Sequence, residues 1–282
     1  MVEWIVTPLS YTFMQRGLLA ALMVGVLCAV IGCYVVLRSM AFLGDAMAHA
    51  VMPGVAVAYL LGGNLTLGAM VAAVAVALGI GFFSRQGTIK EDTAIGILFS
   101  AALSLGIVLI SSIRTYAVDL SHILFGNVLG VSRADLWLTA VLGAAILLIT
   151  FLAYKPFLLI SFDPVLATTL RLRVEFFRNL LLVLLALTIV VSIQTVGVAL
   201  VAAMLVTPGA TAYLLTRRLP AMMGVSAAIG GISGLIGLYA SYYLNVASGA
   251  AVVLTATLIF SLVFLLAPRR GLVWERLKSS RS

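Results

Sequence analysis

Long apolar runs separated by short polar gaps dominate this sequence. Each run approaches or exceeds the roughly 18 to 20 residues that a helix needs to cross a bilayer, and the charged residues are concentrated in the gaps. We expect nine transmembrane helices, with eight as the alternative count. The expected spans are residues 17–37, 42–62, 65–83, 93–113, 135–154, 179–196, 198–215, 221–243 and 247–267.

The seventh span is the reason for the alternative count. Thr207-Pro208-Gly209 interrupts its apolar run, and this pattern is compatible with a broken helix or a re-entrant segment. The first run is too long for a signal-peptide core and follows no basic segment, so we expect it to be retained. Within it, Cys28 and Cys33 have neither CxxC nor zinc-site spacing and are expected to be buried packing residues.

Composition supports the membrane interpretation. Hydrophobic residues make up 63% of the chain, charged residues 9%, and the mean hydropathy is +1.24. These values are far from those of a soluble domain. We expect an all-α polytopic membrane protein in which residues 1–282 form a single domain.

The basic residues predict how the chain is oriented. With nine spans and the N-terminus outside, fourteen of the seventeen Lys and Arg residues fall on the cytoplasmic side, as the positive-inside rule requires. This distribution explains the net charge of +8 and gives no support to nucleic-acid binding. The basic tail, residues 269–282, is expected to be cytoplasmic and to lie on anionic membrane lipid.

Two ionisable residues within the second apolar run are the main candidates for chemistry. Asp45 and His49 are four residues apart, so they share one face of a helix. An intramembrane carboxylate costs roughly 2.5 to 3.5 kcal/mol, so it usually pairs, lines a polar cavity or has a function. A divalent cation is the expected occupant, and the alternative is a hydrogen-bonded pair that locks neighbouring helices.

Enzyme motifs are absent from the sequence. It contains no GxxxxGK[ST] phosphate loop, no HExxH and no GxSxG, so we expect a transport subunit rather than an enzyme. If ATP drives transport, a separate subunit must hydrolyse it. The gap from Lys155 to Arg173 offers a docking element, because Asp163 can cap a helix that begins at Pro164, with Leu166 and Leu170 on one face. An interfacial helix without a partner is the alternative.

A second acidic and imidazole pair occurs in an outer loop. Asp119 and His122 are three residues apart and would form an outer metal contact if that stretch were helical; an outer gate or a docking surface for a delivering protein is a second interpretation. An ordinary polar loop is the favoured interpretation.

The segment Gly44–Gly54 resembles the GDxxxHAxxPG signature of the membrane permeases of bacterial ABC importers for manganese, zinc and iron. Four further segments follow in that family's order, and the resemblance covers roughly residues 15 to 268. These segments are Asp92–Ile97, His122–Asn127, Thr207–Ala212 and Gly249–Leu254.

The resemblance implies a type II ABC importer fold related to the vitamin B12 permease. It implies two copies of this chain in the bacterial plasma membrane, two cytoplasmic ATP-binding subunits and an extracytoplasmic metal-binding protein that delivers the ion. Asp45 and His49 match the family's metal-coordinating pair, and no permanently bound cofactor is expected. The coupling helix to the ATPase is expected within residues 161–173, from Ser161, Asp163, Pro164, Leu166, Ala167 and Leu170.

The identity of the transported metal follows from weaker signals. A carboxylate and an imidazole completed by oxygen donors suit Mn²⁺, whereas a tight zinc site would be richer in His or Cys. The segment His122–Asn127 is also more similar to manganese importers than to zinc importers, so Mn²⁺ is expected, with Zn²⁺ or Fe²⁺ as alternatives. An ion-coupled secondary transporter or a passive channel are the other functional classes, and both differ from an importer in not needing ATP.

Overall fold

The computed structural model describes residues 2–85, 90–112 and 130–267. Within these ranges every regular element is a helix, and nine spans are long and apolar enough to cross a membrane. The predicted all-α fold with nine spans is therefore confirmed. The spans are α2 (Thr12–Leu37), α3 with α4 (Leu43–Ala50 and Met52–Leu60), α5 (Leu65–Ser84), α6 (Glu91–Ser111), α8 (Arg133–Leu152), α11 (Val174–Val196), α12 (Val198–Leu215), α13 (Leu219–Leu244) and α14 (Ser248–Leu266).

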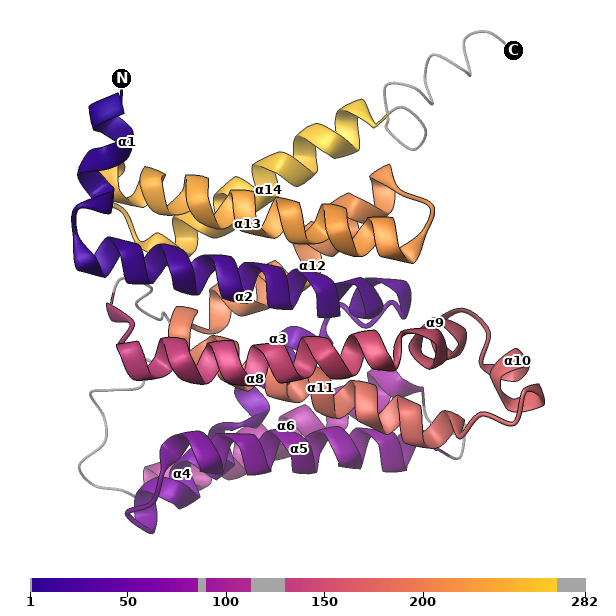
Figure 1. Cartoon of the computed structure of the whole chain (residues 1–282). Coiled ribbons are helices and arrows are strands. Elements are labelled where there is room, and N and C mark those ends of the chain that lie inside the picture. The colour runs from indigo at the N-terminus through magenta and orange to yellow at the C-terminus, as the bar shows by residue number, and fades with distance from the viewer. Residues whose placement is uncertain (1, 86–89, 113–129, 268–282) are drawn as a thin grey trace, which may run out of the picture.

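Three shorter helices lie at the two ends of the bundle (Figure 1). α1 (Val2–Leu9) precedes the first span at the end where the N-terminus lies. α9 (Tyr154–Phe162) and α10 (Pro164–Thr169) project at the opposite end, where the turn between α12 and α13 also lies. The longest gap between expected spans is therefore largely helical.

The second span is two helices rather than the single one expected. α3 ends at Ala50 and α4 begins at Met52, with Val51 between them. Pro53 lies in the first turn of α4, and its ring nitrogen cannot donate a hydrogen bond to the carbonyl of His49 four residues earlier. The proline therefore ends the regular helix next to the candidate metal pair.

The alternative of a broken or re-entrant helix at Thr207-Pro208-Gly209 is wrong. α12 continues through Pro208, and the chain instead turns at Gly197, whose φ of 87° favours glycine. A Cβ atom added to Gly209 would lie 3.3 Å from the carbonyl carbon of Gly32 on α2. Packing against this neighbouring helix explains why the Pro-Gly pair is accommodated within a continuous helix.

α2 is the central helix of the bundle, and small residues allow its neighbours to approach closely. Gly230 of α13 packs against the backbone of Gly25, so this glycine serves packing inside one chain. Cys28 and Cys33 lie on the same helix and are fully buried free thiols, as predicted. By contrast, α6, α8 and α14 are the least buried spans and expose many large apolar side chains.

A charged cluster joins four helices at the end of the bundle where α2 ends. Arg38 Nη2 donates to Glu91 Oε1 and Oε2 at 2.6 and 2.8 Å. Arg178 Nη2 donates at 2.9 Å to the carbonyl of Gly81 on α5 and at 2.8 Å to Glu175 Oε2. The side chains of Arg38, Glu91 and Arg178 are only 12%, 20% and 14% exposed, so their contacts with one another are shielded from water, whereas Glu175 is 43% exposed.

Candidate metal-binding site

The short helix α3 positions the candidate metal pair. Asp45 and His49 lie one turn apart, and His49 Nε2 is 3.8 Å from Asp45 Oδ1. The side chain of Asp45 is 50% exposed and that of His49 is 25% exposed. Asp45 also lies in the first turn of α3, where the positive end of the helix dipole favours a carboxylate. Both groups can therefore approach one ion from the uncovered side of α3.

The alternative interpretation, a hydrogen-bonded lock between helices, finds no support in this geometry. The separation of 3.8 Å is too long for a hydrogen bond, and both residues belong to the same helix. Among the described residues, neither side chain hydrogen-bonds to another helix. Two polar groups in an apolar protein that make no hydrogen bond within the described part of the chain are suited to an external ligand.

α3 is held by tight contacts on its other sides. A Cβ atom added to Gly44 would lie 2.9 Å from Leu205 Cδ2 of α12, so these helices are in close contact. On the side of α6, the ring of Phe99 lies 6.2 Å from that of His49 and 5.8 Å from that of Phe42, measured between centroids. Phe99 was not anticipated from the sequence, because its proximity to His49 depends on the packing of α3 on α6.

The described part of one chain does not complete a coordination shell. No group of three or more His, Cys, Asp or Glu residues could hold a metal ion among the described residues. Asp45 and His49 together offer oxygen and nitrogen donors, whereas Mn²⁺ favours more ligands, mostly oxygen. The remaining ligands of a bound ion would come from water, backbone carbonyls, residues outside the described ranges or another chain.

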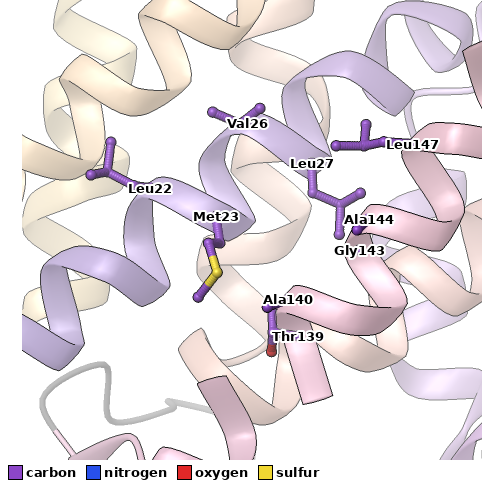
Figure 2. A pocket seen from close by; sticks show the side chains of 9 residues that line it. All are labelled: Leu22, Met23, Val26, Leu27, Thr139, Ala140, Gly143, Ala144 and Leu147. Carbon is purple, nitrogen blue, oxygen red and sulfur yellow. The ribbon is translucent and has the colours of Figure 1, made fainter. Parts of the chain in front are cut away.

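A second hollow in the bundle lacks the side chains that bind a cation. It lies between α2 and α8, has a volume of about 380 Å³, and is drawn in Figure 2. Thr139 provides the only polar side chain among the residues that line it. It has no carboxylate, imidazole or thiolate, so it is not a metal site.

The short helix expected to begin at Pro164 is present, while its role as a coupling helix stays a prediction. Asp163 Oδ1 accepts a hydrogen bond of 2.9 Å from the N–H of Leu166, and Pro164 occupies the first turn of α10, as expected. Two boundaries differ from the expectation, because Ser161 belongs to α9 and Leu170 follows α10 as its C-cap residue. The extended backbone of Asp163 separates the two helices and produces this difference.

The exposed surface of this segment is apolar. Leu166 and Leu170 are 45% and 57% exposed, whereas Ala167 is fully buried. Exposed apolar side chains on a projecting helix are typical of a protein–protein or membrane contact.

Two further predictions concern residues outside the described ranges. Asp119 and His122 lie between residues 112 and 130, and the basic tail 269–282 lies beyond residue 267. Their roles stay predictions from the sequence.

Comparison with known proteins gives matches over most of the chain. Residues 10–267 match the family described as the ABC 3 transport family. The "Manganese transport system membrane protein MntC" of Halalkalibacterium halodurans is 51% identical, over 97% of this chain and 94% of the relative. A "Probable iron transport system membrane protein" of Haemophilus influenzae is 44% identical, over 92% of this chain and 96% of the relative.

Solved structures give a consistent picture of the fold. A chain of "PsaBC from Streptococcus pneumoniae in complex with Fab" has a TM-score of 0.85 and 41% identity, with 98% of this chain and 99% of that chain covered. A putative metal-chelate type ABC transporter in an inward-facing conformation has a TM-score of 0.72 and 16% identity, with coverages of 89% and 85%. At that identity, the second likeness concerns the fold alone.

Proposed function

Because this chain belongs to the ABC 3 transport family, we propose that it is the membrane-spanning permease subunit of an ATP-driven importer of divalent metal ions, with Mn²⁺ as substrate. The observation that carries the proposal is the pair formed by Asp45 and His49, which is open to a ligand on one face of α3. The manganese-transport name of the relative at 51% identity supports the choice of metal.

The chemistry of the pair suits transient binding. An ionised carboxylate lowers the cost of moving a dication into a low-dielectric environment, and a neutral imidazole adds a nitrogen donor. Two protein donors bind an ion more weakly than a full shell would, which suits a cargo that must leave again. A second copy of the chain, related by a two-fold axis, would bring its own Asp45 and His49 to the same ion.

The partners proposed are the second copy, two ATP-binding subunits and an extracytoplasmic metal-binding protein. α10 and its flanks would contact the ATPase, through the exposed side chains of Leu166 and Leu170. Asp163 fixes the start of that helix and so its direction. Movement of the ATPase subunits during ATP hydrolysis would then reach the membrane helices through α9 and α10.

The proposed location is the bacterial plasma membrane. Nine spans would place the start of α2 and the end of α14 on opposite sides of the membrane, and the positive-inside rule assigns the end that carries α9, α10 and Arg38 to the cytoplasm. α8 begins at the opposite end of the bundle, which this orientation would make extracytoplasmic (Figure 1).

The test is metal uptake into proteoliposomes that contain the chain with its candidate ATPase, supplied with the candidate binding protein. Asp45→Asn should abolish Mn²⁺ uptake, because the amide keeps the shape of the carboxylate and removes its charge. Asp135→Asn, which makes the same change in the capping box of α8, should leave uptake within about twofold of the unchanged protein.

The metals and the energy source are tested in the same vesicles. Mn²⁺, Fe²⁺ and Zn²⁺ are compared with and without ATP. Uptake that continues without ATP and follows a proton gradient would overturn the proposal in favour of the secondary transporter. Normal uptake by assembled Asp45→Asn protein would remove the pair from the mechanism.

A further inference from the structure

A hollow at the end of the bundle near α9 and α10 is distinct from the metal pair. It has a volume of about 420 Å³ and lies where the ends of three long helices and of α9 meet. The turn between α12 and α13 forms one wall, and Figure 1 shows this turn at the same end as α9 and α10. Its lining residues are Leu37, Phe162, Tyr213, Thr216, Arg217, Arg218, Leu219 and Met222.

The polar half of this hollow carries two positive charges. Arg217 and Arg218 are consecutive in the turn between α12 and α13, and both are exposed. Within the described part of the chain, neither guanidinium has a carboxylate partner. Arg38 and Arg178, in contrast, both lie beside Glu91. The two arginines of the hollow therefore present uncompensated charge to whatever occupies it.

The other half of the hollow is apolar. Phe162 of α9 is 64% exposed and Leu37, the last residue of α2, is half-buried, whereas Leu219 and Met222 of the first turn of α13 line the hollow but are buried. Aliphatic side chains thus lie directly beside two guanidinium groups at the level where the membrane helices end. A soluble anion would satisfy the arginines and leave the apolar wall in contact with water. An amphiphile with an anionic headgroup satisfies both halves.

We propose that this hollow binds an anionic glycerophospholipid. The headgroup phosphate bonds to Arg217 and Arg218, because a guanidinium can offer two parallel N–H donors to phosphate oxygens. The upper part of an acyl chain packs on Phe162 and Leu37, the apolar lining residues that are not buried. Basic pockets between membrane helices on the cytoplasmic side are suited to such headgroups.

The position of the hollow links lipid binding to transport. Phe162 lines the hollow and is the last residue of α9, and Asp163, the cap of α10, follows it directly. A lipid in the hollow therefore packs beside the junction that orients α10. This step rests on the proposed function of α10 as the coupling helix. We expect ATP-driven uptake in vesicles that contain anionic lipid to be at least twofold higher than in vesicles of phosphatidylcholine alone.

Binding is measured first, without any transport assay. The purified full chain is delipidated, titrated with phosphatidylglycerol or phosphatidylcholine, and examined by native mass spectrometry for retained lipid. We expect one phosphatidylglycerol to be retained with clear preference over phosphatidylcholine. Arg217→Gln combined with Arg218→Gln should weaken its binding by roughly thirtyfold, since two basic groups near the membrane surface are lost.

Matched variants make the result specific. Arg85→Gln combined with Lys90→Gln removes the same charge from exposed positions outside the lining of the hollow and should leave binding within about twofold. Arg217→Lys combined with Arg218→Lys keeps the charge but removes the paired N–H donors, so its lipid binding should lie between that of the unchanged chain and that of the glutamine variant. Unchanged thermal unfolding of the glutamine variant shows that it is folded.

Three outcomes would overturn the proposal. Equal loss of lipid in the two glutamine double variants would show a general effect of surface charge. Displacement of the bound lipid by inorganic phosphate at equal concentration would show that the apolar wall contributes nothing. Unchanged lipid binding with lost binding of the ATPase subunit would assign the arginines to a protein contact. None of these outcomes depends on whether the transported ion is Mn²⁺.

Discussion

Gly32 shows how closely single residues determine the packing of this bundle. A Cβ atom at this position would clash with the carbonyl oxygen of Leu205 on α12, and a backbone atom cannot move as a side chain can. Gly32→Ala is therefore expected to lower the free energy of unfolding by roughly 1–3 kcal/mol. The midpoint of thermal unfolding of the purified chain measures this.

The control for Gly32 is Gly96→Ala on α6. Nothing lies within 4 Å of the added Cβ atom there, and alanine has the higher helix propensity. Gly96→Ala should leave the midpoint unchanged or raise it. Equal shifts in both variants would show that the contact between α2 and α12 is looser than the structure indicates.

His49 is expected to affect the choice of metal more than the ability to bind one. His49→Gln removes an imidazole and leaves oxygen donors, and imidazole contributes more to Zn²⁺ binding than to Mn²⁺ binding. The concentration of Zn²⁺ that halves Mn²⁺ uptake should therefore rise by roughly tenfold. An unchanged value would show that His49 does not contact the ion.

At the residue scale, the sequence predicted the pair but not its surroundings. The spacing of Asp45 and His49 alone places both on one helix face, and their separation of 3.8 Å agrees with that. The ring of Phe99 beside His49 could not be predicted, because it depends on how two helices pack. The extent of exposure of Asp45 depends on the same packing.

At the scale of helices, the charged cluster around Glu91 holds α2, α6 and α11 together. Glu91→Gln would leave Arg38 and Arg178 largely buried with less compensating charge. We expect a loss of about 3 kcal/mol in the free energy of unfolding, because removing one partner of a buried ion pair strands the other. Denaturant titration of the purified chain measures this loss.

Two further variants separate charge pairing from local structure. Asp92→Asn changes the neighbouring exposed carboxylate and should cost less than about 0.5 kcal/mol. Arg38→Gln combined with Glu91→Gln removes one charge of each sign, leaves Arg178 with Glu175, and should recover much of the loss. If the double variant were less stable than Glu91→Gln alone, charge imbalance would not be the cause.

The positions of the helices were largely predictable, whereas their breaks were not. The length of an apolar run determines whether a helix can cross the membrane. The expected span 65–83 therefore agrees closely with α5 (Leu65–Ser84). Breaks depend on neighbours as well as on local sequence. Pro53 separates α3 from α4, but Pro208 is accommodated inside α12, where Gly209 packs on α2. The residues around each proline do not reveal which of the two interrupts its helix.

For the whole molecule, the sequence predicts which end of the bundle faces the cytoplasm. It does not predict which helix surfaces contact lipid and which contact a second subunit. The positive-inside rule uses only the order of spans and charges, which the sequence contains. α6, α8 and α14 expose apolar residues to their surroundings, and lipid and a second subunit are both compatible with such a surface. The sequence therefore predicts the orientation of the helices in the membrane, whereas the surfaces buried between subunits depend on the folded shape of two chains.

The orientation can be tested by labelling introduced cysteines, because the chain's own Cys28 and Cys33 are fully buried and give little background. Ser10 lies between α1 and α2, and Lys90 precedes α6 at the opposite end; both are exposed. In intact cells, a membrane-impermeant maleimide should label Ser10→Cys strongly and Lys90→Cys only after permeabilisation. The reverse pattern would place α9 and α10 outside the cell. There they could not contact a cytoplasmic ATPase, and the proposed coupling route would fail together with the orientation.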